Sequence, residues 1–319
     1  MRIGWVFYIV SVMLSVLIGA LLFLVVQPEF GSQSNVATSP LPPSLSLNAN
    51  KEVSTLDIWQ PQENVTDATL PLTATSALSY DLTSRQFLLE KNISQQLPMA
   101  SLTKIMTATV AMEHPKKDDK YLVQQSALVG EDSMGLTVGE VLSKNELLYG
   151  LMLHSGNDAA EVLADNFPGG RSAFIKAMND KAVSLGLINT HFTNPTGLEG
   201  DGKQYTTARD LLVMTQYAMM HFPEFVLIIK TFDYTIPHTT THQEYDLENE
   251  TNLLTSYPGV EGVKTGYTPE AGLCLVTYLN YSGHQIIAVI LGSENRRQEM
   301  KDILDFSLKK IGITPPRHG

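Results

Sequence analysis

Hydrophobic residues form one long run at the start of the chain and shorter periodic runs after about residue 70. From Ile3 to Val26 there is no charged residue, and about 20 apolar residues suffice to cross a bilayer as a helix. Between residues 27 and 72, apolar residues are scattered among Ser, Pro, Asn and Thr and cannot support a packed core. The pattern predicts a transmembrane anchor over residues 1–26, a flexible linker over 27–72 and a folded domain over 73–312, followed by a tail over 313–319.

Short apolar runs lie near both ends of the folded part. SALSYDL and QFLLEKN flank a turn at Thr83–Arg85, and LCLVTYLNY and QIIAVILGS flank Ser282–Gly283, which predicts two hairpins. Apolar residues at helical spacing predict a terminal helix over about residues 296–311 and helical stretches between the hairpins, over residues 103–114, 145–167, 172–186 and 208–221. We therefore expect an α+β fold in which both chain ends build an antiparallel sheet and the middle is mostly helical.

Charge and cysteine content exclude several classes of function. The formal net charge is -11, the sequence pI is near 5.2 and no run of Lys and Arg occurs, so nucleic acid is not an expected partner. The single cysteine, Cys274, lies in an apolar run. It can form neither a disulfide framework nor a Cys-x-x-Cys metal site, and we expect a buried side chain.

The first residues also predict an orientation in the membrane. Arg2 precedes the apolar run and the next basic residue is Lys51, so the N-terminus is expected in the cytoplasm and the folded domain outside the cell membrane, on a single span. A cleaved signal peptide is the alternative. Its apolar region is usually only about 7 to 15 residues long, and no small-x-small cleavage site follows Val26.

Ser101 stands three residues before Lys104, which places the hydroxyl and the amine on one face of a helix. A serine hydroxyl is a poor nucleophile that needs a nearby unprotonated base, and a lysine can be that base when burial or a second cation lowers its pKa. The spacing is a weak signal alone, because it arises by chance on the order of once per 300 residues. Ser307 and Lys310 give a second match.

Two further motifs follow in a fixed order. Ser155 and Asn157 form Ser-x-Asn, and Lys264 with Thr265 and Gly266 form the chain's single Lys-Thr-Gly. Ser-x-x-Lys, then Ser-x-Asn, then Lys-Thr-Gly is the set found in serine enzymes that react with penicillin. The order makes three weak signals into one strong signal.

With these motifs, the chain resembles the low-molecular-mass penicillin-binding proteins of the D-alanyl-D-alanine carboxypeptidase type, a serine DD-peptidase family that includes DacA-like enzymes. HFTNPTGL (191–198), YTTARDL (205–211) and ENETNLL (248–254) are similar to the family's connecting segments. The resemblance covers about residues 73–312 and implies the β-lactamase/DD-peptidase fold.

The resemblance implies catalytic roles for the first two motifs. Ser101 would be the acylated nucleophile and Lys104 its general base. Ser155 would relay a proton to the leaving amine. Asn157 would hydrogen-bond the substrate peptide and orient Lys104.

It implies substrate-binding roles for the third motif. Lys264 would keep Lys104 unprotonated and attract the substrate carboxylate, to which Thr265 would donate a hydrogen bond. Gly266 would let the substrate backbone approach the strand, because a side chain there would block it.

Two more contacts follow from the resemblance. The backbone N–H groups of Ser101 and Tyr267 would form the oxyanion hole. An arginine beyond the second C-terminal strand would also bind the terminal carboxylate; position favours Arg296, with Arg297 as the rival.

The implied activity is removal of the terminal D-Ala from peptidoglycan stem pentapeptides through an acyl-enzyme, with β-lactams as inhibitors and no cofactor or metal. A DD-endopeptidase, a β-lactamase and a non-catalytic wall-binding module remain alternatives. Larger family members carry a C-terminal β domain and an amphipathic anchor helix; this chain stops at Gly319, so we expect the N-terminal span to anchor the protein.

One cluster of acidic residues is expected to lie outside this chemistry. Asp158, Glu161 and Asp165 follow one another within the predicted helix over residues 145–167. Charged residues at such spacing usually form a solvated helix face.

Overall fold

The computed structural model describes residues 70–318 except 131 and 252, all within a unit that spans Val53–Gly319. The predicted transmembrane anchor and the predicted linker up to residue 69 lie outside the described residues. Within the described part, no single helix has the length and apolarity needed to cross a membrane. A pair of helices bent by 109°, Ala208–His221 and Pro223–Lys230, meets those criteria jointly.

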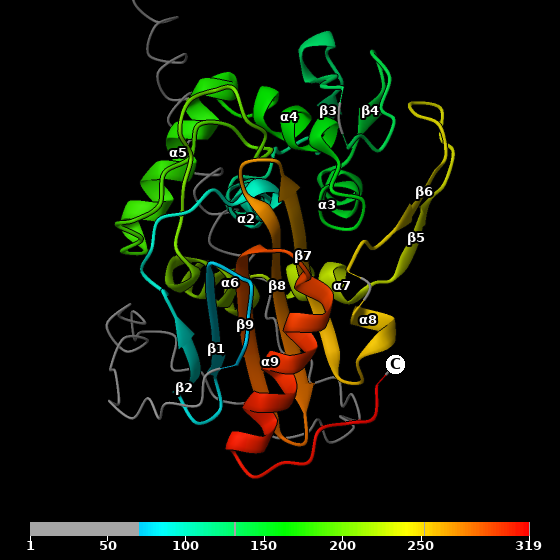
Figure 1. The fold of residues 1–319 in the computed structure, drawn as a ribbon. Coiled ribbons are helices and arrows are strands. Elements are labelled where there is room, and N and C mark those ends of the chain that lie inside the picture. Colours follow the sequence, from blue (N-terminus) through cyan, green and yellow to red (C-terminus); the bar gives the residue numbers. More distant parts are fainter. Residues whose placement is uncertain (1–69, 131, 252, 319) are drawn as a thin grey trace, which may run out of the picture. The chain divides into compact units, whose positions relative to one another are not determined.

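Both ends of the described chain meet in one antiparallel sheet, as predicted (Figure 1). Its strand order is β2-β1-β9-β8-β7, and the pairing of β1 with β9 joins the N-terminal hairpin to the C-terminal one. Strand β7 lies at one edge. The strands are β1 Ser76–Asp81, β2 Gln86–Lys91, β7 Val260–Thr268, β8 Gly272–Tyr281 and β9 His284–Ser293.

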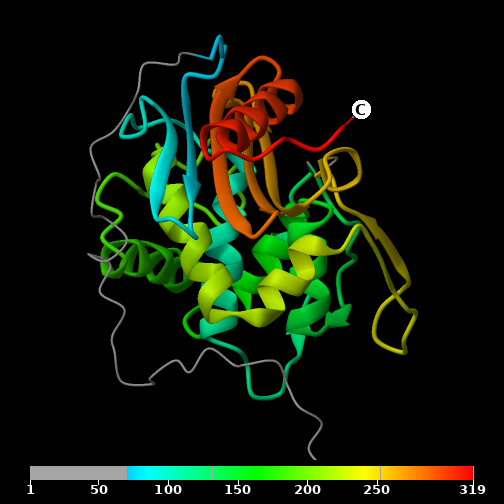
Figure 2. The ribbon, with the colours of Figure 1, turned by 90° about the horizontal axis from the view of Figure 1, so that it is seen from below.

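The central strand β9 is apolar and buried from Ile286 to Leu291 because both faces of the sheet are covered there. Ile286, Ala288 and Ile290 pack with the terminal helix α9, Arg296–Lys310. The alternate residues Ile287, Val289 and Leu291 pack in the core shared with the other helices. Successive side chains of a strand point to opposite faces, so two buried faces explain the unbroken apolar run IIAVIL (Figure 2).

The helices of the middle of the chain pack on the face opposite α9 (Figure 2). The predicted terminal helix and the helix over residues 208–221 are confirmed. Two small two-stranded sheets complete the described part. The bounds are η2 Ala100–Thr103, α2 Lys104–Glu113, β3 Tyr121–Leu122, η3 Gln125–Ala127, β4 Val141–Leu142, α3 Lys144–Met152, α4 Asn157–Asp165, α5 Gly170–Ser184, α6 Ala208–His221, α7 Pro223–Lys230, β5 Asp233–Ile236, β6 Tyr245–Glu248 and α8 Leu253–Ser256.

The stretch 145–167, predicted as helical, is two helices with a break between them. α3 ends at Met152 and α4 begins at Asn157. In the break, Ser155 has a φ of 59°, a left-handed conformation that a helix does not contain. Apolar residues continue at helical spacing across the break. The hydrophobic pattern alone therefore does not show where α3 ends and α4 begins.

The prediction of a solvated face on α4 is wrong for two of its three acidic residues. Asp158 is 0% exposed and Glu161 is 4% exposed. The segment 133–136 folds over α4 and donates hydrogen bonds to the Asp158 carboxylate, and Arg171 pairs with Glu161 at 2.7 Å. A buried carboxylate is stable when such partners replace water. Asp165 is half-buried.

Candidate active site

The site lies where the start of η2 meets the edge strand β7. Gly266 of β7 makes this contact possible, because a Cβ there would lie 3.1 Å from Ser101 N and 3.2 Å from Ala100 Cβ. The strand therefore packs directly against the backbone that precedes the serine side chain. This adds a packing role for Gly266 to the substrate contact expected from sequence.

Ser101 and Lys104 are in contact, as their spacing predicts. Lys104 Nζ lies 2.8 Å from Ser101 Oγ, although η2 is a 3-10 helix and the α-helical turns begin at Lys104. Ser101 is 8% exposed and Lys104 is 0% exposed. Ser101 thus keeps a small exposed surface, whereas Lys104 has none.

Two carbonyl oxygens fix the direction of the Lys104 amine. Nζ donates to Asn157 Oδ1 at 2.7 Å and to the backbone oxygen of Thr196 at 2.8 Å. A neutral amine has two N–H groups and one lone pair. With both N–H groups bound to carbonyls, the lone pair faces Ser101 Oγ and can accept its proton.

The surroundings favour the neutral form of Lys104. Burial, followed by the charge of Lys264, holds the pKa of Lys104 well below its ordinary value of 10.5. Lys264 is 1% exposed, and burial lowers its own pKa to about 8. The charge of Lys264 disfavours a proton on the buried Lys104 amine.

The break between α3 and α4 supplies the second motif. Ser155 is 2% exposed and Asn157 is 0% exposed. The N–H of Asn157 donates to the backbone oxygen of Asp132 at 2.7 Å, which anchors the first residue of α4. The structure thus brings Asn157 onto Lys104 and places Ser155 two residues earlier, in the break between the helices.

The third motif lies on β7, with Lys264, Thr265 and Gly266 all buried or nearly so. Arg296, the first residue of α9, donates to the backbone oxygen of Gly266 at 2.7 Å. The neighbouring Arg297 is exposed. Of the two candidate arginines, Arg296 is therefore the one placed on the motif.

Tyr267 directly follows the third motif on β7. Its side chain is 59% exposed, so it points away from the packed interior. Its backbone pairs with Leu273 of β8, which keeps it on the strand beside Ser101.

The sequence also has the signature of a known family along most of its length. The family described as D-alanyl-D-alanine carboxypeptidase, peptidase S11, matches residues 62–295. The chain belongs to this family.

Relatives share about a third of their residues with this S11 chain. DacF of Bacillus subtilis (strain 168), a D-alanyl-D-alanine carboxypeptidase, is 34% identical over 251 residues, 76% of this chain and 64% of DacF. The D-alanyl-D-alanine carboxypeptidase of Streptomyces sp. (strain K15) is 40% identical over 65% of this chain and 77% of its own. The chain thus spans slightly less than two thirds of DacF.

Solved structures share the fold. The Streptomyces K15 DD-transpeptidase superposes with a TM-score of 0.70 at 33% identity, covering 77% of this chain and 100% of that one. Penicillin-binding protein D2 of Listeria monocytogenes, in its cefotaxime-bound form, gives 0.66 at 29% identity over 75% of this chain and 99% of its own. The predicted DD-peptidase fold is confirmed.

Sequence reasoning missed two contributors to the site of this S11 chain, Gly197 and Thr196. Gly197 has a φ of +92°, and a Cβ there would lie 2.9 Å from Ser101 N and closer still to the Ala100 carbonyl. The Asn194 side chain accepts hydrogen bonds from both residues at 2.8–3.2 Å, and so it positions the Thr196 oxygen that binds Lys104. The quoted segment HFTNPTGL contained them, but residue type alone gave no reason to select them.

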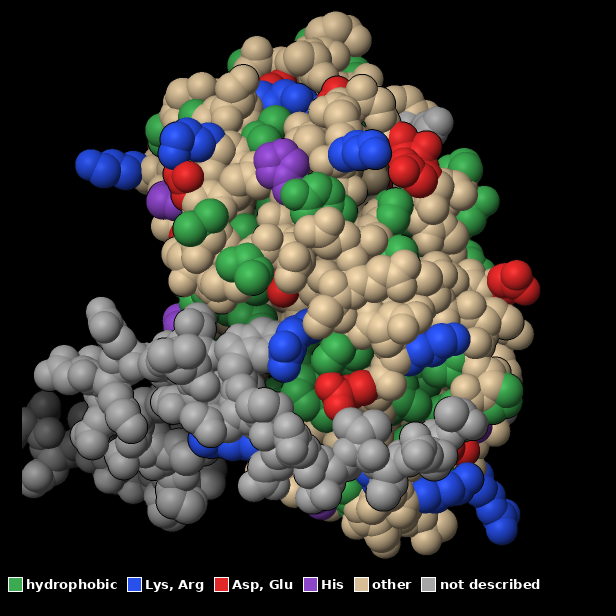
Figure 3. Space-filling model, turned by 60° about the vertical axis from the view of Figure 1, so that its left-hand side comes forward, with side chains coloured by type: hydrophobic (Ala, Val, Ile, Leu, Met, Phe, Trp, Pro, Cys, Tyr) green, Lys and Arg blue, Asp and Glu red, His purple; other side chains and the backbone are tan. Residues whose placement is uncertain are grey.

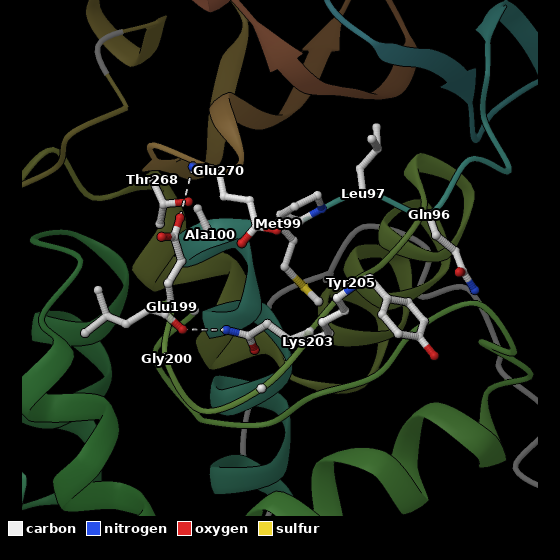
Figure 4. A pocket seen from close by; sticks show the side chains of 15 residues that line it. Gln96, Leu97, Met99, Ala100, Glu199, Gly200, Lys203, Tyr205, Thr268 and Glu270 are labelled. Atoms are coloured by element: carbon white, nitrogen blue, oxygen red, sulfur yellow. Dashed lines mark hydrogen bonds between the residues drawn. The ribbon is translucent and has the colours of Figure 1, made fainter.

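A cavity of about 290 Å³ lies beside Ala100, the residue before Ser101. Its walls come from the segment before Ser101, from the 197–205 loop and from the end of β7 (Figure 4). Glu199 holds the loop to the turn between β7 and β8, because its carboxylate accepts from the N–H of Glu270 at 3.0 Å. Lining residues include Ala100, Gly197, Glu199, Lys203, Thr268 and Glu270.

Proposed function

We propose that this S11 protein is a serine D-Ala-D-Ala carboxypeptidase that removes the terminal D-Ala from peptidoglycan stem pentapeptides through an acyl-enzyme. The observation that carries the proposal is the buried Lys104 amine, which lies 2.8 Å from Ser101 Oγ and whose pKa is lowered by burial and by Lys264. The named relatives are carboxypeptidases, which supports the same reaction.

The first half-reaction would use Ser101, Lys104 and Ser155. Ser101 Oγ bonds to the carbonyl carbon of the penultimate D-Ala as its proton passes to Lys104 Nζ. When the C–N bond breaks, the proton returns through Ser155 to the departing amine, and free D-Ala leaves. Water then attacks the ester, with Lys104 again accepting a proton, and Ser101 is regenerated.

The substrate would be held as an added strand on β7, which is an edge strand of its sheet and packs against the backbone at Ser101. The N–H groups of Ser101 and Tyr267 would stabilise the oxyanion. Thr265 would donate to the terminal carboxylate, with Lys264 and Arg296 as the cations near it. The rest of the stem peptide would run past Thr268 into the cavity of Figure 4.

The first test is release of D-Ala from a stem pentapeptide, compared between the wild type and Ser101→Ala. We expect release by the wild type and loss of about 10³-fold or more in the variant, because the nucleophile is gone. Absence of release by the wild type would contradict the proposal.

A second activity has a specific observation in its favour. A relative in Pseudomonas aeruginosa, 31% identical over 72% of this chain, is a D-alanyl-D-alanine endopeptidase. A cross-linked stem dimer offered beside the pentapeptide separates the two. Faster cleavage of the dimer would make the endopeptidase the main activity, and a long-lived penicilloyl-enzyme would exclude a β-lactamase.

We also propose that the protein works outside the cell membrane, on a single N-terminal span. The uncharged run from Ile3 to Val26 and the basic residue before it support this placement. Stem peptides of the cell wall are substrates on that side.

A further inference from the structure

The leaving-group side of the cleft holds a carboxylate that the proposed chemistry does not use. Glu250 Oε2 accepts a hydrogen bond from Thr265 Oγ1 at 3.1 Å and lies 4.0 Å from Lys264 Nζ. These are the hydroxyl and the amine assigned above to the substrate carboxylate. Glu250 thus makes the contacts that a substrate would make.

The backbone around Glu250 is held by hydrogen bonds, whereas its side chain is partly exposed to solvent. The Glu250 N–H donates to the backbone oxygen of Leu153 at 3.1 Å, and the N–H of Thr251 donates to Asn249 Oδ1 at 2.9 Å. The Glu250 side chain is 43% exposed. A change of rotamer toward solvent can therefore release Thr265 without moving the chain.

A substrate carboxylate and Glu250 compete for one hydrogen atom. The Thr265 hydroxyl has a single proton to donate, so it binds either Glu250 or the substrate. Even after Glu250 turns aside, its negative charge remains near the arriving carboxylate. It offsets one of the two cations there, Lys264 and Arg296, and like charges repel.

We propose that Glu250 is a specificity-determining residue that weakens binding of leaving groups ending in a free carboxylate relative to leaving groups whose carboxyl end is neutral. The inference rests on the proposed function, because it concerns the same site and the same leaving group. Glu250 competes with the substrate for Thr265 and Lys264. A substrate with a free carboxylate must displace it and is also repelled by its negative charge. A substrate whose C-terminal end is neutral displaces the Glu250 side chain without this charge repulsion.

The test compares full-length wild type with Glu250→Gln, which removes the charge and keeps the shape. KM and kcat are measured with a peptide ending in D-Ala-D-Ala, and the inhibition constant with the same peptide as its C-terminal amide. Assays at about pH 6.5 stay below the Lys264 pKa of about 8. The matched control is Glu248→Gln, which removes the same charge from an exposed residue two positions earlier.

We expect Glu250→Gln to lower KM for the acid peptide about three- to fivefold, the size of a partly exposed charge interaction, with the inhibition constant of the amide changed less than about twofold. Glu248→Gln should move neither. Glu250→Asp, which keeps the charge, should retain the KM of the wild type within about twofold.

Unchanged or raised KM for the acid peptide in Glu250→Gln would overturn the inference, as would equal shifts for acid and amide. An equal drop in KM in Glu250→Asp would show that side-chain length, not charge, is responsible, and would also overturn it. In each case the wild type still releases D-Ala, so the proposed function stands. A wild type that releases none would instead refute the proposed function.

Discussion

Lys104 illustrates how a residue that is ordinarily protonated can be prepared to accept a proton. It has no exposed surface, it faces a second buried amine, and two carbonyl oxygens take its N–H groups. Lys264 contributes by its charge. The proposed mechanism needs Lys104 neutral and Lys264 charged. Raising the pH favours the first condition and disfavours the second.

The pH dependence of kcat/KM should reflect the protonation of both Lys104 and Lys264. Activity should rise with pH as Lys104 loses its proton through its lowered pKa, and fall above about pH 8 as Lys264 loses the charge that attracts substrate. The measurement is kcat/KM for the pentapeptide between about pH 5 and about pH 10.

Lys264→Arg is the variant that assigns the alkaline limb. A guanidinium stays protonated to above about pH 12, so the fall near pH 8 should move upward while the acid limb remains. A flat profile in the wild type would contradict Lys104 as the base. An alkaline limb that does not move would contradict the role of Lys264.

At the residue scale, the three motifs predicted the residues proposed for catalysis but not the residues that position them. Ser101 and Lys104 are one helical turn apart, so local geometry alone brings them together. Gly197 and Glu250 reach the site through the tertiary fold. Neither residue type, at its place in the sequence, distinguishes a partner of the cleft from an ordinary loop residue.

The break between α3 and α4 is the element that shapes the cleft. It contains Ser155 and is held from one side by Asp158, whose carboxylate accepts hydrogen bonds from the segment 133–136 at 2.5–3.1 Å. The segment 133–136 is thereby tied to the helix that begins with Asn157. The integrity of this element should depend on that one carboxylate.

Asp158→Ala should lower the free energy of unfolding by about 3 kcal/mol, because it leaves several buried N–H groups without an acceptor. Urea denaturation of the wild type and the variant measures the change. Asp165→Ala is the matched control; that carboxylate accepts from Ser126 Oγ in an exposed position, and its loss should cost less than about 1 kcal/mol. Equal losses in the two variants would contradict a structural role for Asp158.

At the element scale, the sequence predicted hairpins and helices well where one period persists. The hairpins β1–β2 and β8–β9 and the helices α6 and α9 have the predicted type and nearly the predicted limits. The break at Ser155 and the burial of Asp158 were missed for a common reason. Both depend on a loop that returns from elsewhere in the chain, which hydrophobic periodicity does not record.

At the scale of the whole molecule, the sheet joins the two ends of the described chain and leaves β7 at its edge. An edge strand offers unpaired backbone groups to an extended peptide. The Lys and Arg side chains on the face shown in Figure 3 are dispersed rather than clustered. The fold thus places an edge strand next to Ser101, as the proposed binding of a peptide substrate requires.

Removal of residues 1–26 should release the protein from the membrane without changing its catalytic activity. The shortened protein should leave the membrane fraction while its kcat/KM for a soluble pentapeptide stays within about twofold, because the site is built from residues after 73. Cell fractionation and D-Ala release measure the two properties. A shortened protein that still sediments with membranes would refute the N-terminal anchor.

The central claim is that Ser101 becomes acylated because Lys104 can take its proton. Intact-protein mass spectrometry after incubation with penicillin tests it most directly, with wild type, Ser101→Ala and Lys104→Ala compared. We expect the wild type to gain the mass of one penicillin, Ser101→Ala to gain none, and Lys104→Ala to acylate about 10² to 10⁴ times more slowly. An unmodified wild type, or an equal adduct on Ser101→Ala, would contradict the claim.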